Sequence, residues 1–182
     1  MNARRRILAA SLAAATLALL GPQVHAQAPK VLKISHQFPG GTIDEGDFRD
    51  RMLRKFAAEV EKRTNGQLKF EIYPGGSLVK PVEQWGAMAN GSLDLSLYPL
   101  AYAGGRVPEL NIGLMPALVT SYEQGLRWKD APIGKELTRI VEEKGVKIIT
   151  WVWQAGGIAS RGKPILQPDD VKGLKFRGGS KE

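Results

Sequence analysis

The stretch LKFEIY, residues 68–73, decides the fold. Its apolar side chains alternate with charged ones, which is the pattern of a β-strand that buries one face. The stretch VLKIS at 31–35 is short, follows a proline and predicts a second strand. Between the two, residues 47–64 repeat a large apolar side chain at every fourth position, which predicts an amphipathic helix. These side chains are Phe48, Met52, Phe56 and Val60.

The alternation of strands and helices continues toward the carboxyl end. Residues 81–90 predict a second helix with a proline in its first turn, and the alternating residues 93–97 predict a third strand. Strand, helix, strand, helix, strand is the pattern of a parallel sheet flanked by helices, so we expect an α/β fold. Beyond it, the sequence predicts helices over 122–128 and 133–144 and a short helical turn over 168–171.

Three further segments predict strands, over residues 146–153, 158–160 and 174–177. The first of them is the most apolar of the predicted strands. Such runs often lie at the buried centre of a parallel sheet, and we expect the same of residues 146–153.

The first 26 residues have the features of a secretory signal peptide. Three arginines at 4–6 precede an apolar run at 7–20, and VHA at 24–26 supplies a cleavage site. A membrane anchor is the alternative, but crossing a bilayer takes about 20 apolar residues and this run is shorter. We expect cleavage after residue 26 and a mature chain outside the cytoplasm, in the periplasm if the source is Gram-negative. The arginines also fit a loose twin-arginine pattern, so the export route stays open.

Charge and composition narrow the function classes. The 182 residues carry a net charge of +8, and removal of residues 1–26 leaves 23 basic against 18 acidic residues, a mild excess. Basic residues of the predicted helix at 47–64, such as Arg49 and Arg54, are interspersed with acids. This mixture favours a solvated face over a nucleic-acid-binding stripe. Cysteine is absent, which excludes disulfides, cysteine metal sites and cysteine nucleophiles.

Motifs for catalysis are scarce. His36 is the one histidine that follows the signal peptide, so a His/Cys metal site is implausible. The sequence has no G-x-S-x-G elbow, no Walker A loop and no G-x-G-x-x-G fingerprint. A secreted α/β enzyme would need a base with a pKa near neutral, and only His36 is available for that role. We therefore expect neither enzymatic activity nor a cofactor.

Five Gly-Gly pairs occur, nearly all of them close to the end of a predicted strand, at 40–41, 75–76, 104–105, 156–157 and 178–179. Ligands of open α/β sheets bind at the carboxyl ends of strands, where glycines let the backbone approach closely. Glycines are equally common in tight turns that bind nothing. The pairs leave open whether this edge of the sheet is a binding rim.

Four stretches together resemble one family. They are FAAEVEKRTNG at 56–66, FEIYP at 70–74, AMANGSLDL at 87–95 with VPEL at 107–110, and KPILQPDDVKGLKFR at 163–177. In this order they resemble the DctP-type solute-binding proteins of TRAP transporters. The resemblance implies a type II periplasmic-binding-protein-like α/β fold with two lobes. The first lobe, 27–153, would be nearly complete, and the second, starting at 154–182, would be truncated.

The resemblance also implies a function. Such a protein closes around a small organic anion, a carboxylate, and delivers it to a membrane permease driven by a sodium gradient. A binding protein of another importer class is an alternative with the same fold. A secreted α/β enzyme, with His36 as its base, is the alternative from a different class.

In the family, the arginine that ends the last of these stretches pairs with the ligand carboxylate, and here that position is Arg177. A guanidinium can grip a carboxylate through two parallel hydrogen bonds. By their positions near the expected cleft, the further candidates for ligand contact are Tyr102, Trp153, Gln154, His36, Gln37 and Phe48. Each of these six also has a purely structural interpretation, as a packed or strand-end residue.

Two departures from the family pattern bear on the ligand. A second arginine that many members carry twenty residues earlier falls here on Gly157, and a proline-containing segment is replaced by GGSK at 178–181. Either the site holds its carboxylate differently, or it prefers a bulkier ligand with fewer charges. Tyr102 and Trp153 could then face an aromatic or apolar tail of the ligand. Because the chain is shorter than the family pattern, we expect it to bind its solute weakly or not at all by itself.

Overall fold

The computed structural model describes residues 28–178, so the predicted signal peptide at 1–26 lies outside the described part. The centre of the fold is a parallel three-stranded sheet with the strand order β2-β1-β3. β1 spans Lys30–His36, β2 spans Leu68–Tyr73 and β3 spans Leu95–Leu97. Ile34 of β1 lies opposite Ile72 of β2 and Leu95 of β3. The predicted parallel α/β sheet is therefore confirmed.

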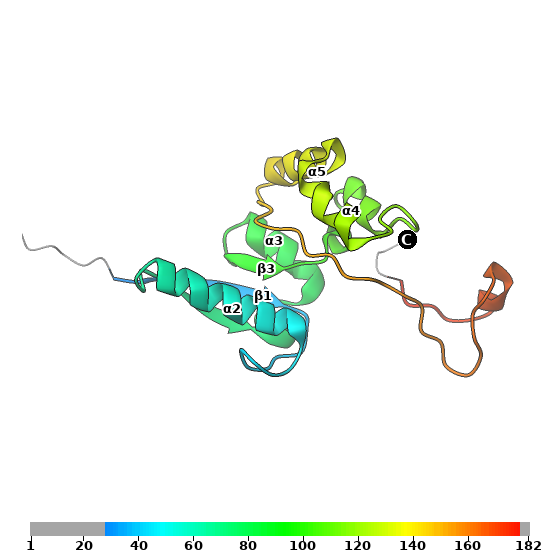
Figure 1. The fold of residues 1–182 in the computed structure, drawn as a ribbon, viewed down its shortest axis with the longest axis horizontal. Coiled ribbons are helices and arrows are strands. Elements are labelled where there is room, and N and C mark those ends of the chain that lie inside the picture. The colour runs from blue at the N-terminus through cyan, green and yellow to red at the C-terminus, as the bar shows by residue number, and fades with distance from the viewer. Residues whose placement is uncertain (1–27, 179–182) are drawn as a thin grey trace, which may run out of the picture.

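Helices connect these strands on both faces of the sheet (Figure 1). α2, Phe48–Arg63, joins β1 to β2, while the 3-10 turns η1 (Pro74–Gly76) and η2 (Pro81–Glu83) and the helix α3 (Gln84–Ala89) join β2 to β3. Successive residues of a strand point to opposite faces. Accordingly, His36 contacts α2 through Asp50, and Ser35 accepts a hydrogen bond from Gln84 of α3.

The ends of α2 follow directly from its sequence. The Asp47 carboxylate caps the amino end by accepting a hydrogen bond of 2.9 Å from the Arg49 N–H. At the other end, Asn65 and Gly66 adopt positive φ angles of 49° and 74°, which terminates the helix. Phe56 of α2 packs against Phe70 of β2, with ring centroids 5.8 Å apart.

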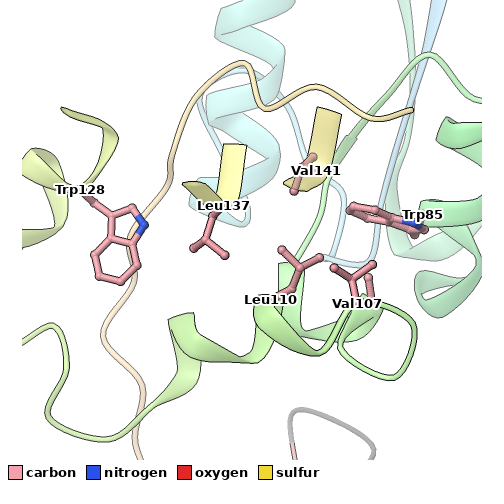
Figure 2. Close-up of a cluster of buried hydrophobic side chains, with 7 residues drawn as sticks. Trp85, Val107, Leu110, Trp128, Leu137 and Val141 are labelled. Carbon is pink, nitrogen blue, oxygen red and sulfur yellow. The ribbon is translucent and has the colours of Figure 1, made fainter. Parts of the chain in front are cut away.

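The remaining helices surround an apolar cluster next to the sheet. They are η3 (Leu100–Ala103), η4 (Pro108–Leu114), α4 (Tyr122–Arg127), η5 (Trp128–Asp130) and α5 (Pro132–Glu143). Figure 2 shows the cluster that they enclose with α3, formed by Trp85, Ala103, Val107, Leu110, Trp128, Leu137 and Val141. The helices predicted over 122–128 and 133–144 are confirmed.

The three late strands were predicted wrongly. Residues 146–153, 158–160 and 174–177 have no strand structure, and only the short helix η6, Pro168–Val171, confirms the prediction for this part. A strand is held by hydrogen bonds to a neighbouring strand, and the sheet of the described residues contains only β1, β2 and β3. Instead, Trp151 and Trp153 pack against Trp128 with centroid distances of 6.4 and 5.2 Å.

Candidate functional site

Three of the predicted ligand contacts meet at the carboxyl edge of the sheet. The Tyr102 hydroxyl donates a hydrogen bond of 2.8 Å to Gln37 Oε1 and accepts one of 3.2 Å from Arg177 Nη2. Gln37 follows β1 directly, Tyr102 lies on η3 after β3, and Arg177 lies near the end of the described chain. Segments far apart in the sequence thus form one group, which we call the Tyr102 group: Gln37, Tyr102 and Arg177.

The Arg177 side chain is exposed, and within the described residues it makes no ion pair. A guanidinium carries five N–H donors, of which the contact with Tyr102 uses one. The remaining donors are available to an anionic oxygen. This arrangement fits the carboxylate contact expected of Arg177.

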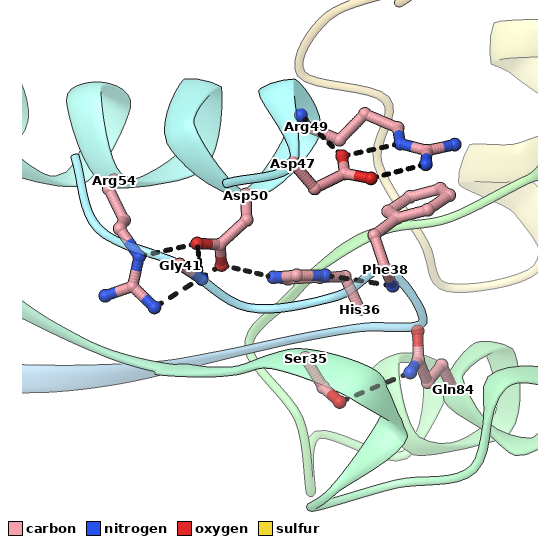
Figure 3. Close-up of polar contacts among 9 residues, drawn as sticks. All are labelled: Ser35, His36, Phe38, Gly41, Asp47, Arg49, Asp50, Arg54 and Gln84. Carbon is pink, nitrogen blue, oxygen red and sulfur yellow. Dashed lines mark hydrogen bonds and ion pairs between the residues drawn. The ribbon is translucent and has the colours of Figure 1, made fainter. Parts of the chain in front are cut away.

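A second group surrounds Arg49 at the amino end of α2 (Figure 3). Its guanidinium lies 3.8 Å from the centroid of the Phe38 ring and 5.2 Å from that of Phe48. Arg49 Nη1 donates to Gln154 Oε1 at 3.2 Å. We call Arg49, Phe38, Phe48 and Gln154 the Arg49 group, and it contains two of the predicted contacts, Phe48 and Gln154.

Asp47 orients Arg49 within this group. Arg49 Nε and Nη2 bond the two Asp47 oxygens at 2.8 and 2.6 Å. The hydrogen bond from Arg49 lowers the pKa of Asp47 to about 2, and the same bond raises the pKa of Arg49. Both groups are therefore charged at neutral pH, and the pair is a fixed dipole beside the sheet edge.

His36 is the last residue of β1, directly before Gln37 and Phe38 of the two groups, and it is completely buried. Its Nε2 lies 3.0 Å from Asp50 Oδ1, and its Nδ1 lies 3.2 Å from the Phe38 N–H. Burial lowers the pKa of His36, although the hydrogen bond to Asp50 opposes this shift. With no exposed surface and both nitrogens engaged, the ring has the environment that its structural interpretation describes.

Asp50 is the second buried member of this arrangement. Besides His36, its carboxylate accepts hydrogen bonds from Arg54 Nε at 2.7 Å and from the Gly41 N–H at 2.9 Å (Figure 3). Burial raises the pKa of Asp50, but the bonds from Arg54, Gly41 and His36 outweigh that effect and hold it below its usual value. The charged carboxylate thus joins α2 to β1 and to the loop between them.

Trp153 lies in neither group. Its indole stacks with Trp151 at 6.2 Å and packs over Gly125, where an added Cβ would lie 2.8 Å from the ring. Its Nε1 is buried without a hydrogen-bond partner among the described residues. These contacts correspond to the structural interpretation of Trp153, as a residue at the margin of the core.

Several glycines of the Gly-Gly pairs have structural reasons of their own. Gly75 and Gly76 have φ angles of 65° and 69°, which favour glycine. A Cβ on Gly41 would meet the Glu45 carbonyl, and one on Gly104 would meet the Asn111 side chain. Among the pairs that the structure describes in full, an added Cβ would meet no atom within 4 Å at Gly75, Gly105, Gly156 and Gly157.

The sequence interpretation missed Phe38, Asp50 and the role of Arg49. Arg49 was assigned to a solvated helix face because its neighbours in the helix alternate in charge. One of its partners, the Phe38 ring, comes from the loop after β1 and shares no periodicity with the helix. The signal that was available is local: Asp47 two residues before Arg49 forms both the helix cap and the ion pair.

A further hollow of the described part lies away from both groups. It is an open groove of about 920 Å³ between η4 and α5, lined mainly by apolar residues such as Ile112, Met115, Ile133 and Ile140. Nor do residues 28–178 contain a group of three or more His, Asp and Glu side chains that could hold a metal ion. Among the helices in this range, none has the length and apolar character needed to span a bilayer.

Comparison with known proteins agrees with this architecture. The sequence profile of the DctP family, "Bacterial extracellular solute-binding protein, family 7", matches residues 41–181. A "Solute-binding protein" from Albidiferax ferrireducens is 67% identical over 151 residues, which make up 83% of this chain and 45% of the relative. The "C4-dicarboxylate-binding periplasmic protein DctP" of Rhodobacter capsulatus is 31% identical over 95% of this chain and 51% of its own length.

Solved structures give the same result. The crystal structure of a TRAP periplasmic solute binding protein from Rhodoferax ferrireducens, with bound malonate, matches with a TM-score of 0.79 at 67% identity. The match covers 82% of this chain and 48% of that protein. A similar protein from Chromohalobacter salexigens, with bound D-glucuronate, shares the fold with a TM-score of 0.64 at 22% identity. The chain spans about half the length of the curated relatives that it matches.

Proposed function

Because the chain belongs to the DctP family of bacterial extracellular solute-binding proteins, we propose that it is part of a receptor that captures a small organic carboxylate. The receptor delivers this solute to a TRAP-type membrane permease. The malonate bound to the similar protein from Rhodoferax ferrireducens supports a carboxylate ligand.

The Tyr102 group carries this proposal. An exposed guanidinium is held by a tyrosine hydroxyl, which is itself oriented by a glutamine carboxamide. Residues 27–153 form the first lobe and 154–182 begin the second. Arg177 then comes from one lobe, while Gln37 and Tyr102 come from the other. A carboxylate bound by Arg177 would be enclosed when the two lobes close by a hinge motion.

Residues 1–26 direct the protein out of the cytoplasm in this proposal, as the location of the family implies. Fractionation of cells that produce the tagged chain tests this part. The tagged chain should accumulate in the periplasmic fraction, and a variant with Arg4, Arg5 and Arg6 replaced by glutamate should stay in the cytoplasm. Equal distribution of the two chains would contradict the role of residues 1–26.

Binding is best measured on a chimera in which this chain is followed by the carboxyl-terminal part of the Rhodoferax ferrireducens relative. Calorimetry with malonate and with a series of monocarboxylates then gives the affinity. Arg177→Met should weaken the tightest ligand by at least about tenfold, because a hydrogen bond to a charged group contributes about 1.5–3 kcal/mol. Arg161→Met, an exposed arginine in the same segment, is the matched control and should change little.

Three results would count against the proposal. They are the absence of carboxylate binding by the chimera, equal affinity of the Arg177→Met variant, and a loss in the Arg161→Met variant as large as that at Arg177. For the 182-residue chain alone, we expect weak binding or none. Micromolar binding by that chain would contradict this expectation.

A further inference from the structure

We propose that His36 is a positioning residue for the ligand site: its neutral ring, held by Asp50, fixes the backbone at Phe38 and thereby places Gln37 and Phe38. The role in ligand binding rests on the proposed function. The positioning itself concerns only contacts among residues that the structure describes.

The hydrogen bonds define which ring nitrogen carries the proton. Nδ1 faces the Phe38 N–H, which can only donate, so Nδ1 must be the acceptor. Nε2 therefore carries the hydrogen and donates it to Asp50 Oδ1. Asp50 in turn is fixed by Arg54 and by the Gly41 N–H. The buried carboxylate selects the one tautomer that can hold Phe38.

The Tyr102 group and the Arg49 group each contain one residue of the loop that this tautomer fixes. Gln37 accepts from Tyr102, which contacts Arg177. Phe38, the next residue, provides the ring on which Arg49 lies, and Arg49 contacts Gln154. The His36 and Phe38 rings also stack, with centroids 5.9 Å apart. A shift of Phe38 would therefore disturb both sets of contacts between the first lobe and residues after 153.

Protonation of His36 would remove this support. The imidazolium carries N–H groups on both nitrogens, so Nδ1–H would oppose the Phe38 N–H instead of accepting from it. The charged groups that act on the ring are Asp50 and Asp47, which favour the imidazolium, and Arg54, which disfavours it. All three belong to α2 or its cap, and the buried site adds a further cost for the charged ring.

Two substitutions separate the roles of the two nitrogens. In His36→Asn, the side-chain oxygen can occupy the place of Nδ1 and accept from Phe38, while the bond to Asp50 is lost. In His36→Gln, the amide nitrogen can reach the place of Nε2 and donate to Asp50, but nothing accepts from Phe38. Both variants replace the ring by a carboxamide. They differ in which hydrogen bond they can keep, the one from the Phe38 N–H or the one to Asp50.

Amide hydrogen exchange by NMR on the 182-residue chain provides the first readout. Protection of the Phe38 amide should persist in His36→Asn and fall about fivefold or more in His36→Gln, since one net hydrogen bond is worth about 1 kcal/mol. In the unsubstituted chain, this protection should fall as the pH is lowered through the His36 pKa. The Gly66 amide, bonded to the Glu61 carbonyl, serves as the internal reference and should not change.

The chimera provides the second readout. Affinity for its tightest carboxylate should fall about fivefold in His36→Gln and stay within twofold in His36→Asn. Equal Phe38 protection in the two variants, or protection that does not vary with pH, would overturn the positioning role. A changed Phe38 amide with unchanged affinity would overturn its connection to the ligand site. Failure of the unsubstituted chimera to bind any carboxylate would instead overturn the proposed function.

Discussion

Replacement of Asp50 by asparagine gives a direct measure of the energy stored in the buried contacts beneath the site. The carboxylate is fully buried and accepts bonds from Arg54 Nε, the Gly41 N–H and His36 Nε2 at 2.7, 2.9 and 3.0 Å. The asparagine amide keeps one acceptor oxygen, but its NH₂ group must face at least one of these donors. The variant therefore removes charge and leaves a buried donor without a partner.

The expected loss is about 3 kcal/mol. Breaking a buried ion pair by removal of one partner costs about 3–5 kcal/mol. The lower end applies because the Arg54 side chain is 29% exposed and can turn toward water. For a chain of this size, 3 kcal/mol corresponds to a fall in Tm of about 6–12 °C. Urea unfolding followed by circular dichroism gives the free energy of unfolding at an unchanged m-value.

The same helix contains a matched control. Arg63 and Glu59 form an ion pair with the same i,i+4 spacing as Arg54 and Asp50, but their side chains are 75% and 51% exposed. Glu59→Gln should cost less than about 0.5 kcal/mol, as exposed helix pairs do. A loss at Asp50 below about 1 kcal/mol, or equal losses at the two positions, would refute the assignment of the buried carboxylate as the anchor of this region.

Lowering the pH should weaken the same contacts, and the pKa shifts of Asp50 and His36 indicate over which pH range. The pKa of Asp50 is lowered in the folded state, so its contribution is present above the unfolded value near 3.8 and is lost as the pH falls through the folded value. The pKa of His36 is also lowered, so the unfolded chain binds its proton first, and stability declines as the pH falls below 6.5. Asp50→Asn should flatten the loss at low pH.

Three other substitutions test the packing and the cap. Leu110→Ala should destabilise the core by about 2–5 kcal/mol in urea unfolding, whereas Leu166→Ala, at 85% exposure, should change it by less than about 0.5 kcal/mol. Gly134→Ala places a Cβ against the Trp128 carbonyl and should cost about 1–3 kcal/mol, with Gly113→Ala, which faces open space, as the neutral comparison in thermal melts. Asp47→Ala removes the cap of α2 and should cost about 0.5–2 kcal/mol at neutral pH. Because the pKa of Asp47 is about 2, that difference should shrink only as the pH falls from about 4 toward 2.

The local patterns of the sequence were sufficient for the first half of the fold. The alternation in 68–73 and the four-residue repeat in 47–64 predicted a strand and a helix, and the structure has both at these places. The predicted helix face is only partly covered, because Phe48 and Phe56 remain 49% and 36% exposed. The apolar run at 146–153 was misleading because the same residues suit a buried strand or a segment that packs through its tryptophans. Only the presence of a strand to pair with decides between the two, and periodicity carries no information on partners.

For the candidate site too, the sequence predicted some of the residues and missed the contacts between them. Arg177, Tyr102 and Gln37 were predicted separately, and in the structure Tyr102 is hydrogen-bonded to each of the other two. Phe38 was not predicted because an aromatic residue in a loop has no distinguishing pattern until its partner is known. Its partner, Arg49, lies eleven residues later, beyond a glycine-containing loop. Contacts across loops are set by tertiary structure, so the sequence indicated single residues but not their grouping.

The position of the buried charges explains why ligand affinity should be more sensitive to acid than the global stability of the fold. A ligand contact on a loop is useful only if the loop is held in one conformation, because ordering it on binding would cost free energy. Here the Phe38 and Gly41 N–H groups of the loop are bonded to His36 and Asp50, which are fully buried. Arg54, which is 29% exposed, holds Asp50 in turn. Protonation of His36 or Asp50 removes a bond to that loop before the core itself is affected. Loss of ligand affinity should therefore precede global unfolding when the pH is lowered, and a coincident loss of both would argue that the loop and the core form one cooperative unit.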